Sequence, residues 1–160
     1  MVDNNGQKMA LFDELLGLNQ YLAFLAKLQD YAMRSGHQVI ALVYGNSSAG
    51  AFIGFGLSAG HTYALPNADT YVMSLPAIAR VTKLPLNYLK DLSTKIAVFA
   101  PGIQNFYLSG GLQEIWNGDL NLCLEKALTK EQKQDLRAKT GAARKGRPVA
   151  EKIIERVINA

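Results

Sequence analysis

The feature that most constrains the fold is the stretch QVIALVYGNSSAGAF, in which an apolar run passes directly into small residues and then into a second apolar run. A continuous apolar segment of this length predicts a β-strand over Gln38–Tyr44, of the type that is buried on both faces in α/β folds. The small residues of Gly45–Gly50 then predict a tight turn. Ser47 or Ser48 can cap a following helix that runs to about Ala59.

Periodicity and breaker residues predict the other elements, and the alternation of strands and helices favours an α/β fold. The predicted strands are Val2-Asp3, His61–Leu65, Thr70–Met73 and Leu112–Trp116. The predicted helices are Leu11–Met33, Pro76–Lys83, Leu86–Phe99, Gly102–Leu108, Thr129–Lys139 and Val149–Ile158, with an exposed loop at Gly141–Pro148.

Composition indicates a single domain over residues 1–160 that associates with a partner. Hydrophobic residues make up 49% of the chain, enough for a substantial core, whereas charged residues make up only 19%. A large share of the surface must therefore be apolar or covered, as in an oligomer or a subunit. The aromatic side chains exceed what the core needs, so we expect some of them to face a partner: Phe24, Phe52, Phe55, Phe99, Phe106 and Trp116.

Cysteine usage and hydropathy restrict the compartment and the metal chemistry. The lone Cys123 excludes an intramolecular disulfide and a cysteine-rich metal site, and no metal is predicted. The segment Met1–Lys8 lacks the apolar core of a signal peptide, and glycine or polar residues interrupt every long apolar stretch. We therefore expect a cytoplasmic protein with no membrane segment.

Positive charge gathers in the helical C-terminal part of the chain, about residues 126–160. Residues 126–156 hold ten Lys or Arg and four Asp or Glu, a net charge of +6, so the remaining residues carry −2. Such a stretch attracts an anionic partner, although it is also typical of a solvated helix surface. It lacks interleaved aromatic residues and a recognition motif, so nucleic-acid binding is not expected.

The small-residue turn does not match the common glycine motifs. A phosphate-binding loop needs Lys and then Ser or Thr after the second glycine, and here Ala51 and Phe52 follow Gly50. A dinucleotide fingerprint fails as well, because Gly54 and Gly56 lie inside the predicted helix, where they favour close helix packing. The turn is one residue short of the G-x-S-x-G motif of serine hydrolases.

A hydrolase is also disfavoured by the histidines, since His37 and His61 both precede Asp69 in the chain. The backbone of the turn offers another chemistry. A strand that enters a helix through small residues presents free N–H groups at the helix N-terminus, where they stabilise negative charge on an oxygen such as that of a thioester enolate. An ordinary capped helix is the alternative interpretation of the same residues.

These residues also carry a family resemblance. The stretch VIALVYGNSSAGAFIGFGLSAGHTYALPNADTYVMSLPAIARVT resembles the gamma subunit of malonate decarboxylase, a carboxyltransferase-type family of the crotonase superfamily. Three other stretches extend the similarity over essentially all 160 residues: VDNNGQKMALFDELLGLNQYLAFLAKL, GLQEIWN and GAARKGRPVAEKIIERVI. The resemblance implies a crotonase-like (ClpP/crotonase) spiral fold, and the family's N-terminal part is expected to be missing here.

The resemblance implies an oxyanion hole of backbone N–H groups. One donor falls on Ala49, with Gly50 beside it, and the opposing donors come from the turn at Gly6, Gln7 and Lys8. Ser48 is then expected to contact the substrate. The same region also resembles the Clp protease, whose nucleophilic serine falls on Ala49 and whose histidine falls on Ser74, so proteolysis is not expected.

The function implied is that of a gamma subunit that acts with a beta subunit on malonyl thioester carried by an acyl carrier protein. The products are carbon dioxide and the acetyl thioester. No cofactor is bound directly, because the carrier's prosthetic group holds the substrate, and a biotin carrier accepts the carboxyl group in a biotin-dependent version. The alternatives are a carboxyltransferase subunit of an acyl-CoA carboxylase and a non-catalytic scaffold subunit.

Four basic residues receive roles in this hypothesis. Arg80 contacts the carboxylate of the substrate or a chain terminus, or else forms an ion pair with an acid such as Asp69. Arg144, Lys145 and Arg147 are expected to be exposed together by the loop at 141–148 and to dock the acidic carrier protein.

Overall fold

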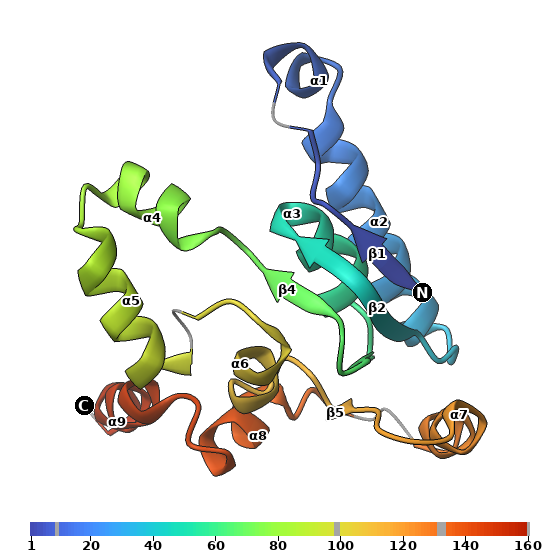
Figure 1. Cartoon of the computed structure of the whole chain (residues 1–160). Coiled ribbons are helices and arrows are strands. Elements are labelled where there is room, and N and C mark those ends of the chain that lie inside the picture. The colour runs from blue at the N-terminus through green and yellow to red at the C-terminus, as the bar shows by residue number, and fades with distance from the viewer. Residues whose placement is uncertain (9, 98–99, 131–133, 160) are drawn as a thin grey trace.

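The computed structural model describes residues 1–8, 10–97, 100–130 and 134–159, which form a mixed α/β structure around a five-stranded parallel sheet (Figure 1). The strand order is β1-β2-β3-β5, and β4 pairs with the far end of β2. The strands are β1 Val2–Asn4, β2 Ile40–Ser48, β3 His61–Ala64, β4 Asp69–Tyr71 and β5 Glu114–Ile115. Each matches a strand predicted from the sequence, with different ends.

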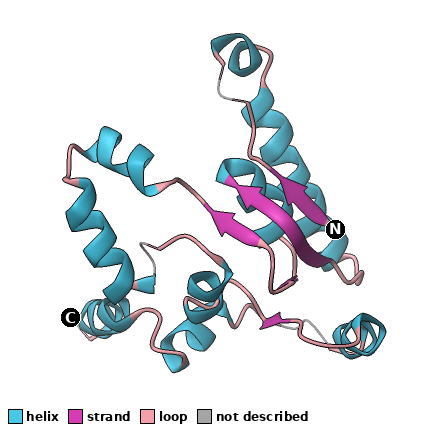
Figure 2. Ribbon diagram, in the orientation of Figure 1, coloured by secondary structure: helices cyan, strands magenta, loops and turns pink. Residues whose placement is uncertain are grey.

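Helices surround this sheet unevenly. α2 and the α3–η1 helix lie against one face, α4 and α5 extend to one side, and α6, α8 and α9 lie below β4 in the views of Figures 1 and 2. The bounds are α1 Leu11–Leu15, α2 Leu18–Arg34, α3 Ala49–Phe52, η1 (a π-helical turn) Ile53–Leu57, α4 Leu75–Thr82, α5 Leu86–Lys95, α6 Ile103–Leu108, α7 Leu120–Leu128, α8 Arg137–Ala143 and α9 Pro148–Ile158.

Strand β2 divides the core into two clusters because its side chains alternate between the faces. Ala41 and Val43 pack with Phe52 and other buried residues on the α2–η1 side. Ile40 and Leu42 pack against the cluster of Tyr63, Trp116 and Ala127 on the other side. Since Tyr44 is 43% exposed, the prediction that this strand is buried on both faces is wrong at Tyr44, its predicted last residue.

The strand is also longer than predicted, because Gly45–Ser48 pairs on both sides. Ser47 aligns with Asn4 of β1, and Ser48 aligns with Tyr71 of β4. The chain turns only at Ala49, whose φ of +57° lies in the left-handed region. Neither serine side chain forms a helix cap: Ser48 holds the N-cap position of α3 without a side-chain hydrogen bond.

Two glycines alter the helices of the N-terminal half. Gly17, with φ +85°, separates α1 from α2, so the single helix predicted over Leu11–Met33 is wrong. Gly54 lies against α2, where a Cβ would make an ordinary contact at 3.4 Å from the Leu22 carbonyl oxygen. The Gln29 side-chain amide of α2 donates to the Gly54 carbonyl at 3.1 Å, which confirms close helix packing at Gly54, whereas Gly56 makes room for the Phe52 ring of its own helix.

The C-terminal half departs most from the sequence prediction. The predicted helix Thr129–Lys139 is wrong: α7 ends at Leu128, and α8 begins at Arg137. The Asp119 carboxylate starts α7 by accepting from the backbone N–H groups of Asn121 and Leu122. The end that was predicted for α5, Phe99, lies outside the described residues.

Helices α6 and α8 approach each other with backbone against backbone. A Cβ at Gly110 would overlap the carbonyl of Arg137, and a Cβ at Gly141 would overlap the carbonyl of Ser109. A Cβ at Gly146 would overlap the carbonyl of Leu108 in the same way. Glycine is therefore required at three positions of this contact.

The aromatic residues divide between core and surface. Phe52 and Trp116 are buried, and Phe106 packs edge-on against Phe52 at 5.1 Å between ring centroids. Phe24 is 57% exposed and Phe55 44% exposed. The helices in the described part of the chain are too short or too polar to cross a membrane.

Candidate functional site

The junction of β2 and α3 presents unpaired backbone N–H groups. Ala49 leaves the strand in a left-handed conformation and begins the helix, so its N–H and that of Gly50 belong to the first turn. The N–H groups of a first helical turn have no partner within the helix. Within residues 1–8, 10–97, 100–130 and 134–159, no hydrogen bond occupies either group.

The turn after β1 faces this junction at van der Waals distance. Gly6 has φ +85°, and a Cβ on it would lie 3.0 Å from the Ser48 Oγ and 3.1 Å from the Ala49 Cβ. The Asn4 Oδ1 accepts from the N–H of Gly6 at 3.2 Å and from that of Ser48 at 3.4 Å. Asn4 therefore locks the turn against the end of β2, and the Gly6 N–H is already occupied.

The side chain of Gln7 completes the contact. Its Oε1 accepts from the Ala51 N–H at 3.2 Å, which fixes the orientation of the amide. Its Nε2 then points over Gly50, where a Cβ would lie only 2.9 Å away. No partner of Nε2 is found among the described residues, so this amide offers a further N–H donor next to the helix start. Sequence reasoning assigned only the backbone of Gln7 and missed its side chain.

Four of the five residues predicted for the oxyanion hole, Gly6, Gln7, Ala49 and Gly50, thus lie together, from two segments about forty residues apart. Among the described residues, the backbone N–H groups of Gln7, Lys8, Ala49 and Gly50 have no hydrogen-bond partner. The Lys8 side chain is exposed and pairs with Asp13 at 3.3 Å. Unpaired N–H groups beside a helix start can bind a carboxylate or an oxygen that develops negative charge.

The same geometry disfavours a serine hydrolase at Ser48. Ser48 is 3% exposed, and its Oγ faces Gly6. His61 pairs with Ile40, eight residues before Ser48 along β2, a separation of roughly 26 Å at the rise of a strand. His37 is exposed and precedes β2.

Burial, together with the charge of Lys130, lowers the pKa of His61, and neither of its ring nitrogens has a partner in the described structure. The imidazole therefore lies beside the Tyr63 ring of the second core cluster rather than at the junction, and its lowered pKa disfavours the charged form.

Arg80 lies away from the junction. It is an exposed residue of α4, which Figure 1 shows set apart from the sheet. The structure does not bring it into an ion pair with Asp69: no partner for Arg80 occurs in the ranges that the structure describes. An ion pair of Arg80 with Asp69 is therefore not formed among the described residues, and contact with a substrate carboxylate stays a prediction.

The three basic residues assigned to carrier docking are not equivalent. The Arg144 guanidinium donates to the carbonyl oxygens of Tyr107 (2.6 Å), Leu112 (2.7 Å) and Gln113 (2.8 Å), and it stacks on the Tyr107 ring at 3.6 Å. The prediction that the 141–148 loop exposes all three is therefore wrong for Arg144, because these carbonyls compete with solvent for its N–H groups. Lys145 and Arg147 are exposed.

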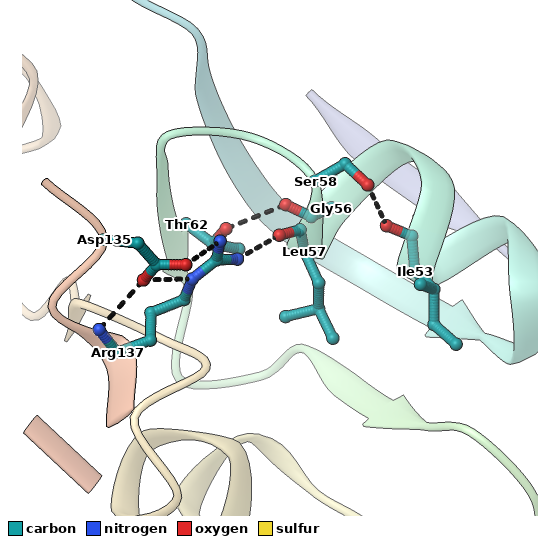
Figure 3. Close-up of polar contacts among 7 residues, drawn as sticks. All are labelled: Ile53, Gly56, Leu57, Ser58, Thr62, Asp135 and Arg137. Atoms are coloured by element: carbon teal, nitrogen blue, oxygen red, sulfur yellow. Dashed lines mark hydrogen bonds and ion pairs between the residues drawn. The ribbon is translucent and has the colours of Figure 1, made fainter. Parts of the chain in front are cut away.

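A second polar cluster closes the C-terminal end of η1 (Figure 3). The Ser58 and Thr62 hydroxyls donate to the carbonyls of Ile53 and Gly56, and Arg137 donates to the carbonyl of Leu57. Arg137 also pairs with Asp135 at 2.6 Å. Hydrogen bonds from Arg137, assisted by the charge of Arg147, lower the pKa of the Asp135 carboxyl. This cluster could not be predicted from the sequence, because its members come from distant segments.

Comparison with known proteins gives consistent matches. The sequence profile of the malonate decarboxylase gamma subunit family matches residues 1–160. The chain is 31% identical over 118 residues to a Malonomonas rubra protein described as the malonyl-S-ACP:biotin-protein carboxyltransferase MADD, a match over 72% of this chain and 40% of that protein.

Two solved structures are similar over 99% of the chain. A chain of a Pseudomonas malonate decarboxylase hetero-tetramer in complex with coenzyme A is 26% identical, with a TM-score of 0.80. A chain of a Pseudomonas malonate decarboxylase MdcD-MdcE hetero-dimer is also 26% identical, with a TM-score of 0.74. The chain spans 65% and 64% of the length of these two relatives.

Proposed function

The chain belongs to the malonate decarboxylase gamma subunit family, and from this premise we propose that it acts with a beta subunit to decarboxylate malonyl thioester carried by an acyl carrier protein. One observation carries the proposal. The turn at Gly6 and Gln7 packs against the point where β2 becomes a helix, and there the N–H groups of Ala49 and Gly50 have no hydrogen-bond partner in the described part of the chain.

Loss of carbon dioxide from a malonyl thioester leaves the electrons of the broken C–C bond on the α-carbon and the thioester oxygen. N–H groups aimed at that oxygen stabilise this enolate more than they stabilise the substrate, and one such donor is typically worth about 2.7–4 kcal/mol of barrier. Protonation of the α-carbon then gives the acetyl thioester. Small residues at Ala49 and Gly50 let the acyl group reach the backbone.

The fold proposed with this function is the crotonase-like spiral. The parallel sheet and the similarity to solved malonate decarboxylase chains support it. A hetero-oligomer with a beta subunit is part of the proposal, supported by the hetero-dimer and hetero-tetramer in which the solved relatives occur. The exposed rings of Phe24 and Phe55 are candidates for such contacts.

Carrier docking is proposed for Lys145 and Arg147, with Arg144 holding the segment in place. Opposite net charges raise the association rate with an acidic carrier and are screened as salt approaches about 0.15 M. Reversal of Lys145 and Arg147 to glutamate is expected to slow turnover of carrier-bound malonyl while sparing a small malonyl thioester. Equal losses on both substrates would show that these residues support the fold.

A biotin-dependent version of this function is the second candidate, because the Malonomonas rubra relative is described as a malonyl-S-ACP:biotin-protein carboxyltransferase. In that version the carboxyl group passes to a biotin carrier, so the backbone donors serve the same enolate while the acceptor of the carboxyl group differs.

Reconstitution with the beta subunit tests the proposal. We expect release of carbon dioxide from malonyl-carrier protein by the complex, and by neither subunit alone. Formation of carboxybiotin on an added biotin carrier identifies the biotin-dependent version, and activity only on malonyl-coenzyme A identifies the acyl-CoA carboxylase subunit. If the beta subunit alone reaches the full rate, the chain is a scaffold.

A further inference from the structure

A second site lies at the other end of η1 from the proposed oxyanion hole. A cavity of about 470 Å³ opens between the end of η1, the end of β4, α6 and α8. Pockets that hold small molecules are typically about 300–1,000 Å³ and mostly apolar with a few placed polar groups. Leu57, Val72 and Phe106 supply apolar lining, together with Ala97 and Ala100.

The polar lining carries one uncompensated positive charge. Arg137 is fully engaged, because its Nε and Nη2 donate to Asp135 and its Nη1 donates to the Leu57 carbonyl (Figure 3). Asp135 is therefore neutralised. Arg147 uses only its Nε, which donates to the Ser109 carbonyl at 3.1 Å. Its terminal nitrogens have no partner in the described part of the chain, so their N–H groups are available at the cavity.

We propose that this cavity binds a small monocarboxylate with an apolar body. The free fork of Arg147 matches a carboxylate, with two parallel N–H···O bonds. The apolar lining accepts the hydrocarbon part. A single negative charge balances the lining, which has two guanidinium groups and one carboxylate, whereas a doubly charged head would exceed the one uncompensated positive charge.

The site shares Arg147 with the proposed carrier docking but uses none of the residues of the β2–α3 junction. Its test measures hexanoate binding to this chain rather than turnover with a carrier protein. Failure of hexanoate binding therefore leaves the proposed decarboxylation standing, and the reverse also holds.

Hexanoate is the probe, titrated by calorimetry against the whole 160-residue chain at pH 7.5 and low salt. Hexanol provides the same apolar body without charge, and hexyl phosphate provides a largely doubly charged head at this pH. We expect saturable binding of hexanoate and at least about tenfold weaker binding of hexanol, since a charge-assisted pair is among the stronger hydrogen bonds.

Three variants locate the site. Arg147→Gln is expected to weaken hexanoate binding about tenfold. Ala138→Leu fills the cavity from an exposed position of α8, so a comparable loss is expected without removal of a charge. Lys139→Gln, the matched control, removes a neighbouring positive charge that does not line the cavity and should bind hexanoate as the native chain does. Circular dichroism confirms that each variant is folded.

Several results would overturn the proposal. These are no saturable hexanoate binding to the folded native chain, native affinity in both Arg147→Gln and Ala138→Leu, or equal affinity for hexanol. Tighter binding of hexyl phosphate than of hexanoate would overturn the assignment of a single charge.

Discussion

Substitution of Gly50 separates the proposed oxyanion hole from an ordinary helix start. Gly50 does not have a positive φ, so a side chain there adds no left-handed strain. Its Cβ would lie 2.9 Å from the Gln7 Nε2 and 3.4 Å from the Gln7 Oε1, so the Gln7 amide must move. Movement of the amide removes its 3.2 Å hydrogen bond with the Ala51 N–H.

The cost in stability is small. Loss of this partly exposed hydrogen bond costs about 0.5–1.5 kcal/mol. Replacement of glycine by alanine in a helix returns up to about 1 kcal/mol. We therefore expect Gly50→Ala to change the free energy of unfolding by about 1 kcal/mol or less.

The effect on activity should be much larger. A branched side chain at Gly50 covers the donors that face Gln7, and loss of one oxyanion donor lowers kcat about 10²–10³-fold. Gly50→Val is therefore expected to lose at least about a hundredfold in carbon dioxide release by the complex with the beta subunit, and Gly50→Ala somewhat less. Ala49→Val is a weaker probe, because a β-branched residue at φ +57° is strained by itself.

Gly54→Ala is the matched control, since its Cβ meets only the α2 backbone and side chain of Leu22, at 3.4 Å or more. We expect it to keep the native rate. The reasoning would be refuted by a Gly50→Val complex that assembles normally and releases carbon dioxide within about threefold of the native rate. Equal losses in Gly50→Val and Gly54→Ala would point to a general loss of helix packing.

Three further predictions concern single side chains. Arg80→Lys should leave the Tm unchanged, because Arg80 has no partner in the described ranges, and should raise the KM for the malonyl substrate if the guanidinium grips its carboxylate. Arg144→Gln should lower the free energy of unfolding, measured in urea, by about 2–4 kcal/mol, because three carbonyl oxygens lose charge-assisted hydrogen bonds. A value within about 0.5 kcal/mol of the native chain, which is the range of a neutral surface substitution, would contradict this prediction. Because the pKa of His61 is lowered in the fold, the unfolded chain takes up a proton first as pH falls below the usual 6.5. The free energy of unfolding should therefore decrease as the pH falls from 7.5 toward the pKa of His61 in the folded chain. His61→Phe should flatten this pH dependence of stability, and the control His37→Gln should leave it unchanged.

The sequence predicted the strands and much of the helix pattern because local periodicity decides them. It misplaced the end of β2, since glycine, asparagine and serine at 45–48 are turn formers in isolation. Pairing with both β1 and β4 overrides that local preference. Leu120, Leu122 and Leu124 alternate as in a strand, so α7 was missed, although Asp119 was an available N-cap signal.

Part of the candidate site could be predicted from the sequence. The backbone donors at Ala49 and Gly50 and the turn at Gly6–Lys8 were assigned through the family resemblance, and in the structure Gly6 packs against Ala49 and Gln7 against Gly50. The Gln7 side chain and the internal bonds of Arg144 could not be predicted, because they depend on which carbonyls and amides the fold brings near.

The three glycines at the contact of α6 with α8 have a consequence for how this part of the protein unfolds locally. Because backbone meets backbone at Gly110, Gly141 and Gly146, the two helices cannot separate by rotating side chains. They can only part as a unit, with the Arg144 bonds breaking at the same time. Native-state hydrogen exchange should therefore show one shared opening free energy for the amides of Ser109–Gly111 and of α8, a cooperative foldon formed from segments some thirty residues apart.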